Sequence, residues 1–477
     1  MKLENLLSGL FVALNLGQTT AFIVPRATLG AATVDLSTST GEARFLGSAF
    51  IYGFPDNGTD ADSSIPDYFA TDIKFNACRA GGAQTPYAGW AGGGYDGYIG
   101  RFNSTLSNYR TTRKYGAGFI LLPHDLWGSD GSLGGDGLYP GDNGDWSEME
   151  AFLAQVVKDL RDNDMLEGLV FDIWNEPDLE IFWARSWDQY LEYYVRAHRI
   201  IRSVLPTLAK EPEDNIHPRA ELPDTLISGP SGATVPDFQS STWTSWLAAI
   251  SANDTIPDIY SWHQIGDTGR ELDKVIPDFN TLLSQHNLPQ RSIDINEYAA
   301  PERQNPANSA FYLAQLERHN LRGLRANWGS GAGLHDLMAD LVFKDSDGNY
   351  KPNGDWQTYK YYAGMTGDRV ATAASPDLRF DVFGTISEKN VKLLAGTQSL
   401  QASYEISVSG FGRIGLPADG SVSIRTLRFD FDGRSGLIEG PVDLGTTEYT
   451  YTSDTLIIPV ELPTNSTAFA YEFSGGQ

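Results

Sequence analysis

The sequence predicts an α/β fold in which a (β/α)8 TIM barrel is followed by a C-terminal all-β sandwich. Short apolar runs alternate with amphipathic stretches through the middle of the chain, and this alternation is typical of parallel strands connected by helices. Eight such runs over roughly 300 residues favour a closed barrel over an open doubly wound sheet. Past residue 369 the runs are short and are separated by Gly, Asp and Pro, which indicates the sandwich.

The elements of the barrel follow in chain order. We expect its strands at residues 45–52, 73–79, 118–122, 166–173, 226–229, 259–262, 292–296 and 324–328. Amphipathic periodicity predicts helices at 148–160, 187–205, 241–252, 271–285 and 309–320. In the first of these helices, apolar side chains recur at the spacing of one helical face. A hairpin at 342–351, turning at Asp347-Gly348, and a helix at 359–365 complete the barrel.

The β-rich C-terminal region contains predicted strands at 391–394, 403–408, 422–431, 448–452, 456–460 and 468–473. The segment 32–37 is also strand-like, although it precedes the barrel. We therefore divide the chain into a signal peptide at 1–21, a catalytic barrel at 45–367 and a sandwich at 368–477. We expect residues 28–44 to pair with the sandwich.

Charge and the N-terminal segment limit the partners and the compartment. The formal net charge is −26, and so acidic a chain repels phosphate, which excludes nucleic acid and anionic membranes as expected partners. Lys2 precedes an apolar run at 6–16 and the small residues of 19–21, a pattern typical of a secretory signal. A buried N-terminal helix is the alternative, and the run is too short to anchor the chain in a bilayer. We expect a secreted, extracellular protein.

Two further features bear on export. The acceptor triplet for N-glycans, Asn-x-Ser/Thr, occurs at Asn57, Asn103, Asn253 and Asn465. Cys78 is the single cysteine, so the chain cannot form an internal disulfide and must depend on its apolar core. We expect Cys78 to be buried, because an exposed free thiol is reactive.

The strongest chemical signal is the run Phe-Asp-Ile-Trp-Asn-Glu-Pro-Asp at 171–178. A buried strand leads there into Glu176, and the carboxyl ends of barrel strands form the face that carries active sites. Pro177 stops the strand. A helix-capping acid in a surface loop is the alternative, and it fits less well because a buried strand precedes the motif.

A second buried strand, at 292–296, leads into Glu297. Counting strands places Glu176 after the fourth and Glu297 after the seventh, so the two carboxylates could face one glycosidic bond from both sides. The alternative for Glu297 is an acid that only forms a salt bridge. A general acid needs a raised pKa and a nucleophile must stay ionised. We therefore expect a raised pKa for Glu176 and hydrogen-bond donors around Glu297.

Other polar and aromatic residues are predicted to act beside these glutamates. Asn175 is placed to contact a sugar hydroxyl, and Trp328 can stack on a sugar ring. Arg79 can hold Glu297 as a carboxylate, and His263 can hydrogen-bond Glu297 or the sugar. A structural ion pair for Arg79 and a satisfied core histidine for His263 stay open. Residues on neighbouring strand ends or loops that either contact substrate or pack are His124, Trp174, Trp127, Tyr87 and Trp90.

Trp174-Asn175-Glu176-Pro177, followed by Ile295-Asn296-Glu297-Tyr298, resembles the barrel glycoside hydrolases of clan A. The layout of the whole chain is similar to glycoside hydrolase family 39, which includes β-xylosidases and α-L-iduronidase and joins a barrel to a β-sandwich. The resemblance implies a retaining hydrolase with Glu176 as acid/base, Glu297 as nucleophile and Asn175 in support. The loops 85–100 and 128–144 match no substrate-defining pattern, so an arabinofuranosyl or galactosyl substrate stays open beside a xylosyl one.

The leading hypothesis is a glycoside hydrolase that cleaves O-glycosidic bonds of plant or microbial polysaccharides or oligosaccharides through a covalent glycosyl-enzyme intermediate. A catalytically silent carbohydrate-binding or cell-wall protein and a transglycosidase are the alternatives on the same fold. No cofactor and no metal site are predicted. The histidines lack metal-ligand spacing, and the Gly-rich run at 92–94 lacks the Lys-Ser/Thr of a phosphate loop.

Overall fold

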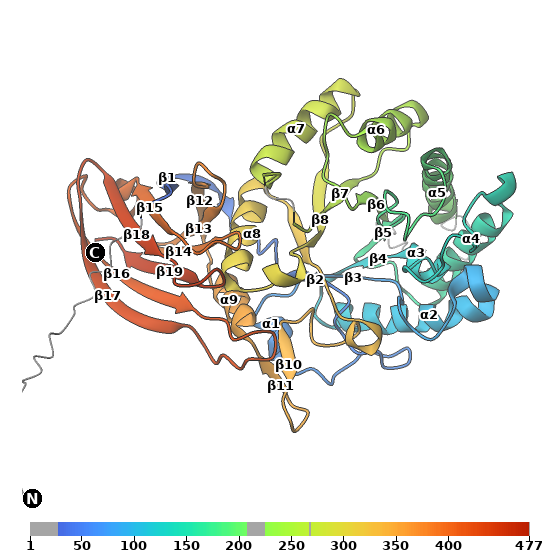
Figure 1. Cartoon of the computed structure of the whole chain (residues 1–477), viewed down its shortest axis with the longest axis horizontal. Coiled ribbons are helices and arrows are strands. Elements are labelled where there is room, and N and C mark those ends of the chain that lie inside the picture. The colour runs from blue at the N-terminus through green and yellow to red at the C-terminus, as the bar shows by residue number, and fades with distance from the viewer. Residues whose placement is uncertain (1–26, 208–224, 267–268, 477) are drawn as a thin grey trace, which may run out of the picture.

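The computed structural model describes residues 27–207, 225–266 and 269–476. Eight parallel strands close into a barrel, as the sequence predicts (Figure 1). In chain order they are β2 (Ala49–Ile51), β3 (Ala77–Ala80), β4 (Gly118–Leu121), β5 (Leu169–Asp172), β6 (Leu226–Gly232), β7 (Ile259–Gln264), β8 (Ser292–Tyr298) and β9 (Arg322–Arg325). These strands are the buried apolar runs of the sequence, so β5 is the fourth barrel strand and β8 the seventh.

Helices surround the barrel. Those that amphipathic periodicity predicts are α4 (Ser147–Asp162), α5 (Trp187–Thr207), α6 (Ser241–Asn253), α7 (Leu272–Gln285) and α8 (Pro306–His319). Side-chain caps fix the start of three helices. The Ser240 hydroxyl accepts from the Trp243 N–H at α6, and the Asn305 carbonyl accepts from the Asn308 N–H at α8. Asn353 likewise caps α9 (Gly354–Ala363), which therefore begins earlier than predicted.

The longest helix, α2 (Gly89–Lys114), is absent from the sequence prediction. Its first half is rich in glycine, which lowers helix propensity, and Gly94 has a φ of 54° that kinks the helix. Tyr98, Phe102 and Leu106 are buried against the barrel, so tertiary packing stabilises a helix that local propensity does not favour. Two short helices, α1 (Tyr68–Thr71) and α3 (Pro123–Trp127), follow β2 and β4.

The remaining strands form one nine-stranded sheet in the order β17-β16-β19-β14-β13-β12-β1-β15-β18. They are β1 (Ala31–Glu42), β12 (Asp368–Ala373), β13 (Phe380–Ser387), β14 (Asn390–Thr397), β15 (Ser403–Ser409), β16 (Gly420–Phe429), β17 (Val442–Tyr451), β18 (Thr455–Glu461) and β19 (Ala468–Ser474). β1 pairs with β12 in antiparallel and with β15 in parallel orientation. Ile406, Leu456, Ile424 and Phe473, from both halves of the sheet, share one apolar cluster. The sandwich interior is thus enclosed by a single curled sheet, whose edge strands β17 and β18 are consecutive in the chain.

The other face of this sheet packs on the barrel through α8, with Phe383 and Leu394 in the apolar core of the barrel (Figure 1). Buried charges cross the same contact, which we call the sheet interface. Arg318 of α8 donates to Asp381 of β13 at 3.0 Å and to Asp273 of α7 at 2.8 Å. A second arginine, Arg369 of β12, donates to Glu317 of α8 at 3.0 Å. The hairpin β10 (Val342–Lys344) and β11 (Tyr350–Pro352) leads from the last barrel strand toward α9.

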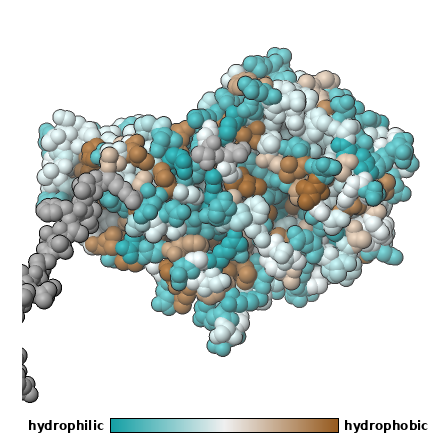
Figure 2. Space-filling view, in the orientation of Figure 1, coloured by the Kyte–Doolittle hydropathy of each residue, from teal (hydrophilic) through white to brown (hydrophobic). Residues whose placement is uncertain are grey.

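Hydrophilic residues cover most of the face shown in Figure 2, with apolar residues in separate patches. No helix in the three described ranges is long and apolar enough to cross a membrane. Cys78 is buried, as predicted. The acceptor residues Asn57 and Asn465 are exposed, whereas Asn103 and Asn253 are partly buried. The predicted signal peptide, residues 1–21, lies outside the described residues.

Candidate active site

Glu176 lies just beyond β5, at the carboxyl end of the barrel. Its backbone has a φ of 43°, in the left-handed region that residues with side chains rarely adopt. The Glu176 N–H donates to the Ser231 carbonyl oxygen at 2.8 Å, and this bond fixes the unusual turn. The side chain is 12% exposed. Such strained positions cluster at functional sites, and here the strained residue is the predicted acid.

Glu297 lies on β8 opposite His263 of β7, and a register shift separates Trp262 from His263 on the same strand. The irregularity matters because side chains of a regular strand alternate between faces. The imidazole of His263 contacts both glutamates. Its Nδ1 atom lies 2.9 Å from Glu176 Oε1, and its Nε2 atom lies 3.6 Å from Glu297 Oε1. The structure therefore brings the two predicted catalytic carboxylates to a single imidazole ring.

Arg79, the third residue of β3, reaches the same cluster from the second strand of the barrel. Its guanidinium donates to Glu297 Oε1 at 2.8 Å, to Asn175 Oδ1 at 2.7 Å and to Asp172 Oδ2 at 2.9 Å. The side chain is fully buried. A buried guanidinium that is shared among acceptors fixes their relative positions as well as their charge. The arrangement agrees with the predicted contact between Arg79 and Glu297.

Asp172 belongs to a layer of buried polar side chains beneath the glutamates that the sequence prediction does not contain. Its Oδ1 atom accepts from the Ser231 hydroxyl at 2.5 Å, and its Oδ2 atom accepts from Asn296 Nδ2 at 3.1 Å. Asn296 Nδ2 and the Ser261 hydroxyl lie 2.7 Å and 2.8 Å from the Ser231 hydroxyl. An acid inside the apolar strand at 169–172 is a sequence signal for such a layer, since an ionised group in a core needs partners. Nothing in the sequence marks Ser231.

The charges of the cluster set the protonation of the glutamates. Burial disfavours the charged form of Glu176, but the positive charges of His263 and Arg79 outweigh burial and hold the pKa of Glu176 below its ordinary value. For Glu297 burial is the stronger effect and raises the pKa, although His263 and Arg79 oppose the rise. Burial lowers the pKa of His263, but Glu297 and Glu176 outweigh it and raise that pKa. The prediction of a raised pKa for Glu176 is therefore wrong, because His263 lies closer to Glu176 than to Glu297.

The remaining predicted residues occupy different environments. Asn175 is 5% exposed, and its carbonyl oxygen already binds Arg79, so only its amide N–H groups can serve a sugar. Trp328 lies past β9, donates its indole N–H to the Ala299 carbonyl oxygen and is 38% exposed. His124 is buried, with Nε2 at 2.9 Å from Asp125 and no protein partner for Nδ1. Trp174 is buried among aromatic rings, including Trp183 at a centroid distance of 5.2 Å.

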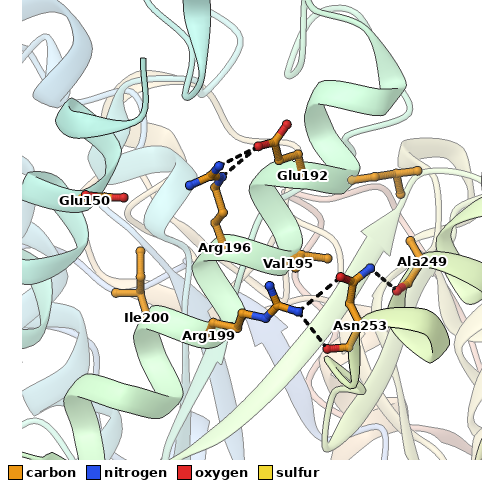
Figure 3. A pocket seen from close by; sticks show the side chains of 9 residues that line it. Glu150, Glu192, Val195, Arg196, Arg199, Ile200, Ala249 and Asn253 are labelled. Carbon is orange, nitrogen blue, oxygen red and sulfur yellow. Dashed lines mark hydrogen bonds and ion pairs between the residues drawn. The ribbon is translucent and has the colours of Figure 1, made fainter. Parts of the chain in front are cut away.

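Outside the barrel mouth, the described residues form no metal site and line an external groove. No group of three or more His, Cys, Asp or Glu side chains within the described ranges could hold a metal ion. A groove of about 550 Å³ lies between α5 and α6 on the outside of the barrel, with Leu191 and Val195 among its lining residues (Figure 3). Arg199 and Asn253 hydrogen-bond each other across it. Its lining residues belong to helices, none to the strand ends that carry Glu176 and Glu297.

Comparisons with known proteins find relatives over most of the chain. No protein-family model matches the chain. The 3-O-alpha-D-galactosyl-alpha-L-arabinofuranosidase of Bifidobacterium longum subsp. longum is 21% identical over 380 residues, which cover 72% of this chain and 31% of that protein. The 3-O-beta-L-arabinopyranosyl-alpha-L-arabinofuranosidase of Bifidobacterium pseudocatenulatum is 20% identical over 368 residues, which cover 72% of this chain and 35% of that protein. The chain thus spans about a third of the length of these curated relatives.

Solved structures share the fold over nearly the whole chain. The structure of N2152 from Neocallimastix frontalis matches with a TM-score of 0.68 and 18% identity, covering 94% of this chain and 100% of that one. A GH39 enzyme from Xanthomonas axonopodis pv. citri matches with a TM-score of 0.57 and 13% identity, covering 97% and 100%. The arabinose complex of an alpha-L-arabinofuranosidase from Thermotoga maritima matches with a TM-score of 0.57 and 11% identity, covering 93% and 100%. The chain therefore shares the fold of these solved structures, which include a GH39 enzyme and an alpha-L-arabinofuranosidase, and this agrees with the resemblance drawn from its two glutamate motifs.

Proposed function

We propose that this protein is a retaining glycoside hydrolase that cleaves arabinofuranosidic linkages in oligosaccharides or in the side chains of polysaccharides. The observation that carries the proposal is the pair Glu176 and Glu297 at the mouth of the barrel, joined by one imidazole ring and partly open to solvent. Retention needs carboxyl groups about 5–5.5 Å apart, whereas inversion needs about 6.5–9.5 Å. Retention in the proposal rests on the resemblance of the two glutamate motifs to the retaining barrel hydrolases of clan A.

In the proposed reaction, a Glu297 carboxylate oxygen attacks the anomeric carbon while Glu176 donates a proton to the departing glycosidic oxygen. The bond to the leaving sugar breaks, and an ester joins the remaining sugar to Glu297. Glu176, now ionised, accepts a proton from a water molecule that attacks the same carbon and releases Glu297. Arg79 neutralises Glu297 when it is the leaving group, and Asn175 donates a hydrogen bond to a sugar hydroxyl.

The proton for the first step is available although Glu176 has a lowered pKa. An imidazolium at His263 paired with ionised Glu176 carries the same number of protons as a neutral imidazole paired with protonated Glu176. A proton on Nδ1 needs to move only along the 2.9 Å contact with Glu176 Oε1. A bound sugar that covers the pair removes water, which disfavours two separated charges and favours the neutral pair. Substrate binding itself thus converts Glu176 into the acid.

The substrate class rests on the curated relatives. Both relatives are named as alpha-L-arabinofuranosidases, and each name gives a second sugar at the 3-position. Because this chain spans about a third of either protein, the shared substrate is part of the proposal. We also propose that the protein is secreted and N-glycosylated at exposed acceptor residues such as Asn57 and Asn465, in line with the N-terminal pattern and the acceptor triplets.

The proposal is tested by incubating the purified protein with α-L-arabinofuranosides, β-D-xylosides and β-D-galactosides that carry the same aryl leaving group. We expect release from the arabinofuranoside at mildly acidic pH, with NMR showing that the first product formed keeps the anomeric configuration of the substrate. An inverted first product would refute retention. Binding of arabinofuranosyl oligosaccharides without any release would identify a catalytically silent carbohydrate-binding protein instead. Mass spectrometry of the secreted protein tests export and glycosylation.

A further inference from the structure

Ser231, the sixth residue of β6, contacts Glu176 directly and is linked to Glu297 through Asp172 and Arg79. Its carbonyl oxygen accepts the backbone N–H of Glu176 at 2.8 Å. Its hydroxyl lies 2.5 Å from Asp172 Oδ1, and Asp172 in turn binds Arg79, the residue that donates to Glu297. We infer that Ser231 is a positioning residue that sets the spacing and the charge of the Glu176–Glu297 pair. The inference rests on the proposed function and adds to it a residue that no sequence pattern marks.

The hydroxyl of Ser231 has its hydrogen-bonding capacity fully used. It has one proton to donate, and the short contact with the Asp172 carboxylate takes it. Asn296 Nδ2, at 2.7 Å, can only donate to it, and the Ser261 hydroxyl at 2.8 Å then donates as well. All four side chains are buried. A hydroxyl with one donated and two accepted bonds has a single orientation, so it fixes the Asp172 carboxylate against which Arg79 is aligned.

The backbone of Ser231 adds a second constraint. Ser231 has a φ of 54°, in the same left-handed region as its partner Glu176 with a φ of 43°. Both conformations are unfavourable for residues with side chains, and the hydrogen bond between the two residues joins them directly. A residue that only filled the core would need neither the strained backbone nor a polar side chain. At this position glycine would adopt the same φ without strain, so the backbone alone does not require serine, whereas the hydroxyl makes three contacts.

Charge explains how the hydroxyl acts at a distance. The Ser231 O–H dipole points its positive end at Asp172 and partly offsets the negative charge there. Without it, Asp172 attracts Arg79 more strongly and presents more negative potential to Glu297. The ionised form of Glu297 then becomes less favourable. Loss of the hydroxyl should therefore slow the attack by Glu297 and move the acid limb of the kcat/KM profile to higher pH.

The test compares three variants of the full chain on the aryl glycoside that the wild-type protein hydrolyses fastest. Ser231→Ala removes the hydroxyl and keeps a side chain at the strained position. Ser231→Gly removes it too but relieves the strain, so this variant folds even if the alanine variant does not. Ser228→Ala is the matched control, because Ser228 lies on the same strand, is equally buried and has a hydroxyl without a partner.

We expect both Ser231 variants to lose about tenfold to a hundredfold in kcat, the range for a lost hydrogen bond to a charged group, with KM changed less. Their acid limb should move to higher pH, which a purely structural defect would not cause. Ser228→Ala should keep the wild-type kcat and pH profile. Ser231 variants that match Ser228→Ala in both readouts would overturn the role of Ser231 while leaving the hydrolase intact. A wild-type chain that hydrolyses none of the glycosides would instead overturn the proposed function, and this role with it.

Discussion

Buried arginines pair with carboxylates both at the mouth of the barrel and at the sheet interface. The two regions differ in the solvent exposure of these carboxylates and in their contact with a histidine. At the sheet interface, Asp381 and Glu317 are fully covered, and Arg318 and Arg369 pair with them. At the mouth, Glu176 and Glu297 remain 12% and 14% exposed and share one imidazole. Buried ion pairs alone therefore do not identify an active site in this fold. The distinguishing feature is a pair of acids that is buried on the protein side and open on the other.

The second difference lies in the balance of charge. Arg318 has two carboxylates, Asp381 and Asp273, and the neighbouring His319 pairs with Asp273. Arg79 also contacts two carboxylates, and the histidine beside it, His263, is shared between Glu297 and a second glutamate, Glu176. Protons can therefore be redistributed at the mouth without breaking the fold, whereas a change at the sheet interface leaves a buried charge unpaired. This contrast predicts opposite outcomes for substitutions of similar chemistry.

The largest expected effect is on turnover. Glu176→Gln should lower kcat by about a hundredfold to ten-thousandfold, the usual contribution of a general acid, and Glu297→Gln should lower it further, since no covalent intermediate can form. Both variants keep the size of the side chain, so thermal unfolding should change little. Steady-state kinetics and calorimetry on the same preparations measure the two quantities. A strong loss of stability with normal turnover of the folded fraction would erase the contrast between the regions.

The sheet interface should respond in the opposite way. Arg318→Ala leaves Asp381 buried and unpaired, so the free energy of unfolding should fall by about 3–5 kcal/mol, while kcat of the folded enzyme stays near the wild-type value. Arg425→Ala is the control, because Arg425 pairs with Asp443 on an exposed part of the same sheet, and it should unfold like the wild type. Urea titration followed by fluorescence compares them. Equal stability of the Arg318 and Arg425 variants would mean that the interface charges contribute nothing.

The pH dependence sharpens the comparison. Because the pKa of His263 is raised, the His263–Glu176 pair keeps its proton up to a pH above about 6.5, the ordinary value for histidine, and activity should fall as pH rises through that raised pKa. The same sign holds for stability, since the imidazolium form stabilises the folded state below that range and the gain is lost above it. In His263→Asn the basic limb of kcat/KM should move to lower pH, where Glu176 alone titrates.

His335→Asn is the matched control for this profile. The pKa of His335 is also raised: burial lowers it, but the carboxylate of Asp56 and the Ala83 carbonyl outweigh burial. Because His335 contacts neither glutamate, its loss should leave the basic limb of the activity profile in place. A profile that moves with His335 and not with His263 would assign the proton to a different group.

The smallest effect is expected for Trp328, the partly exposed side chain that lies past β9. Trp328→Ala should raise KM for a glycoside about twofold to tenfold, the range for loss of one aromatic stacking contact, with kcat less affected. Trp328→Phe should retain most of the binding, because a smaller ring can still stack. Initial-rate kinetics over a range of substrate concentrations separate the two constants. An unchanged KM in the alanine variant would remove Trp328 from the substrate site.

The sequence predicts the barrel well because its strands are strong local signals. All eight predicted strands overlap β2 to β9, and the positions of Glu176 and Glu297 after the fourth and seventh strands follow from that count. Two elements of the sheet, β12 and β13, are absent from the prediction. In β13 nearly every residue is buried on both faces, so the polar-apolar alternation that marks a half-exposed strand is missing. Helix α2 is also absent from the prediction. Its glycines lower the helix propensity of the segment, and only tertiary packing stabilises it.

The site is predictable only in part. The contact between Arg79 and Glu297 could be anticipated from strand ends, because each residue is the last but one of a parallel strand of one barrel. The order of the glutamate pKa values could not, since it depends on which carboxylate lies nearer the shared imidazole. Ser231 could not be found either, because its role arises from a backbone turn and from side chains that are 30 to 65 residues away in the chain.

The most direct test of the account is to trap the covalent intermediate. An arabinofuranoside with fluorine at the 2-position and a good leaving group should inactivate the enzyme with one sugar attached per chain, and peptide mass mapping should place that sugar on Glu297. The Glu297→Gln variant should remain unlabelled. A stable label on Glu176 or on an acid outside the barrel mouth would contradict the assignment of the two carboxylates.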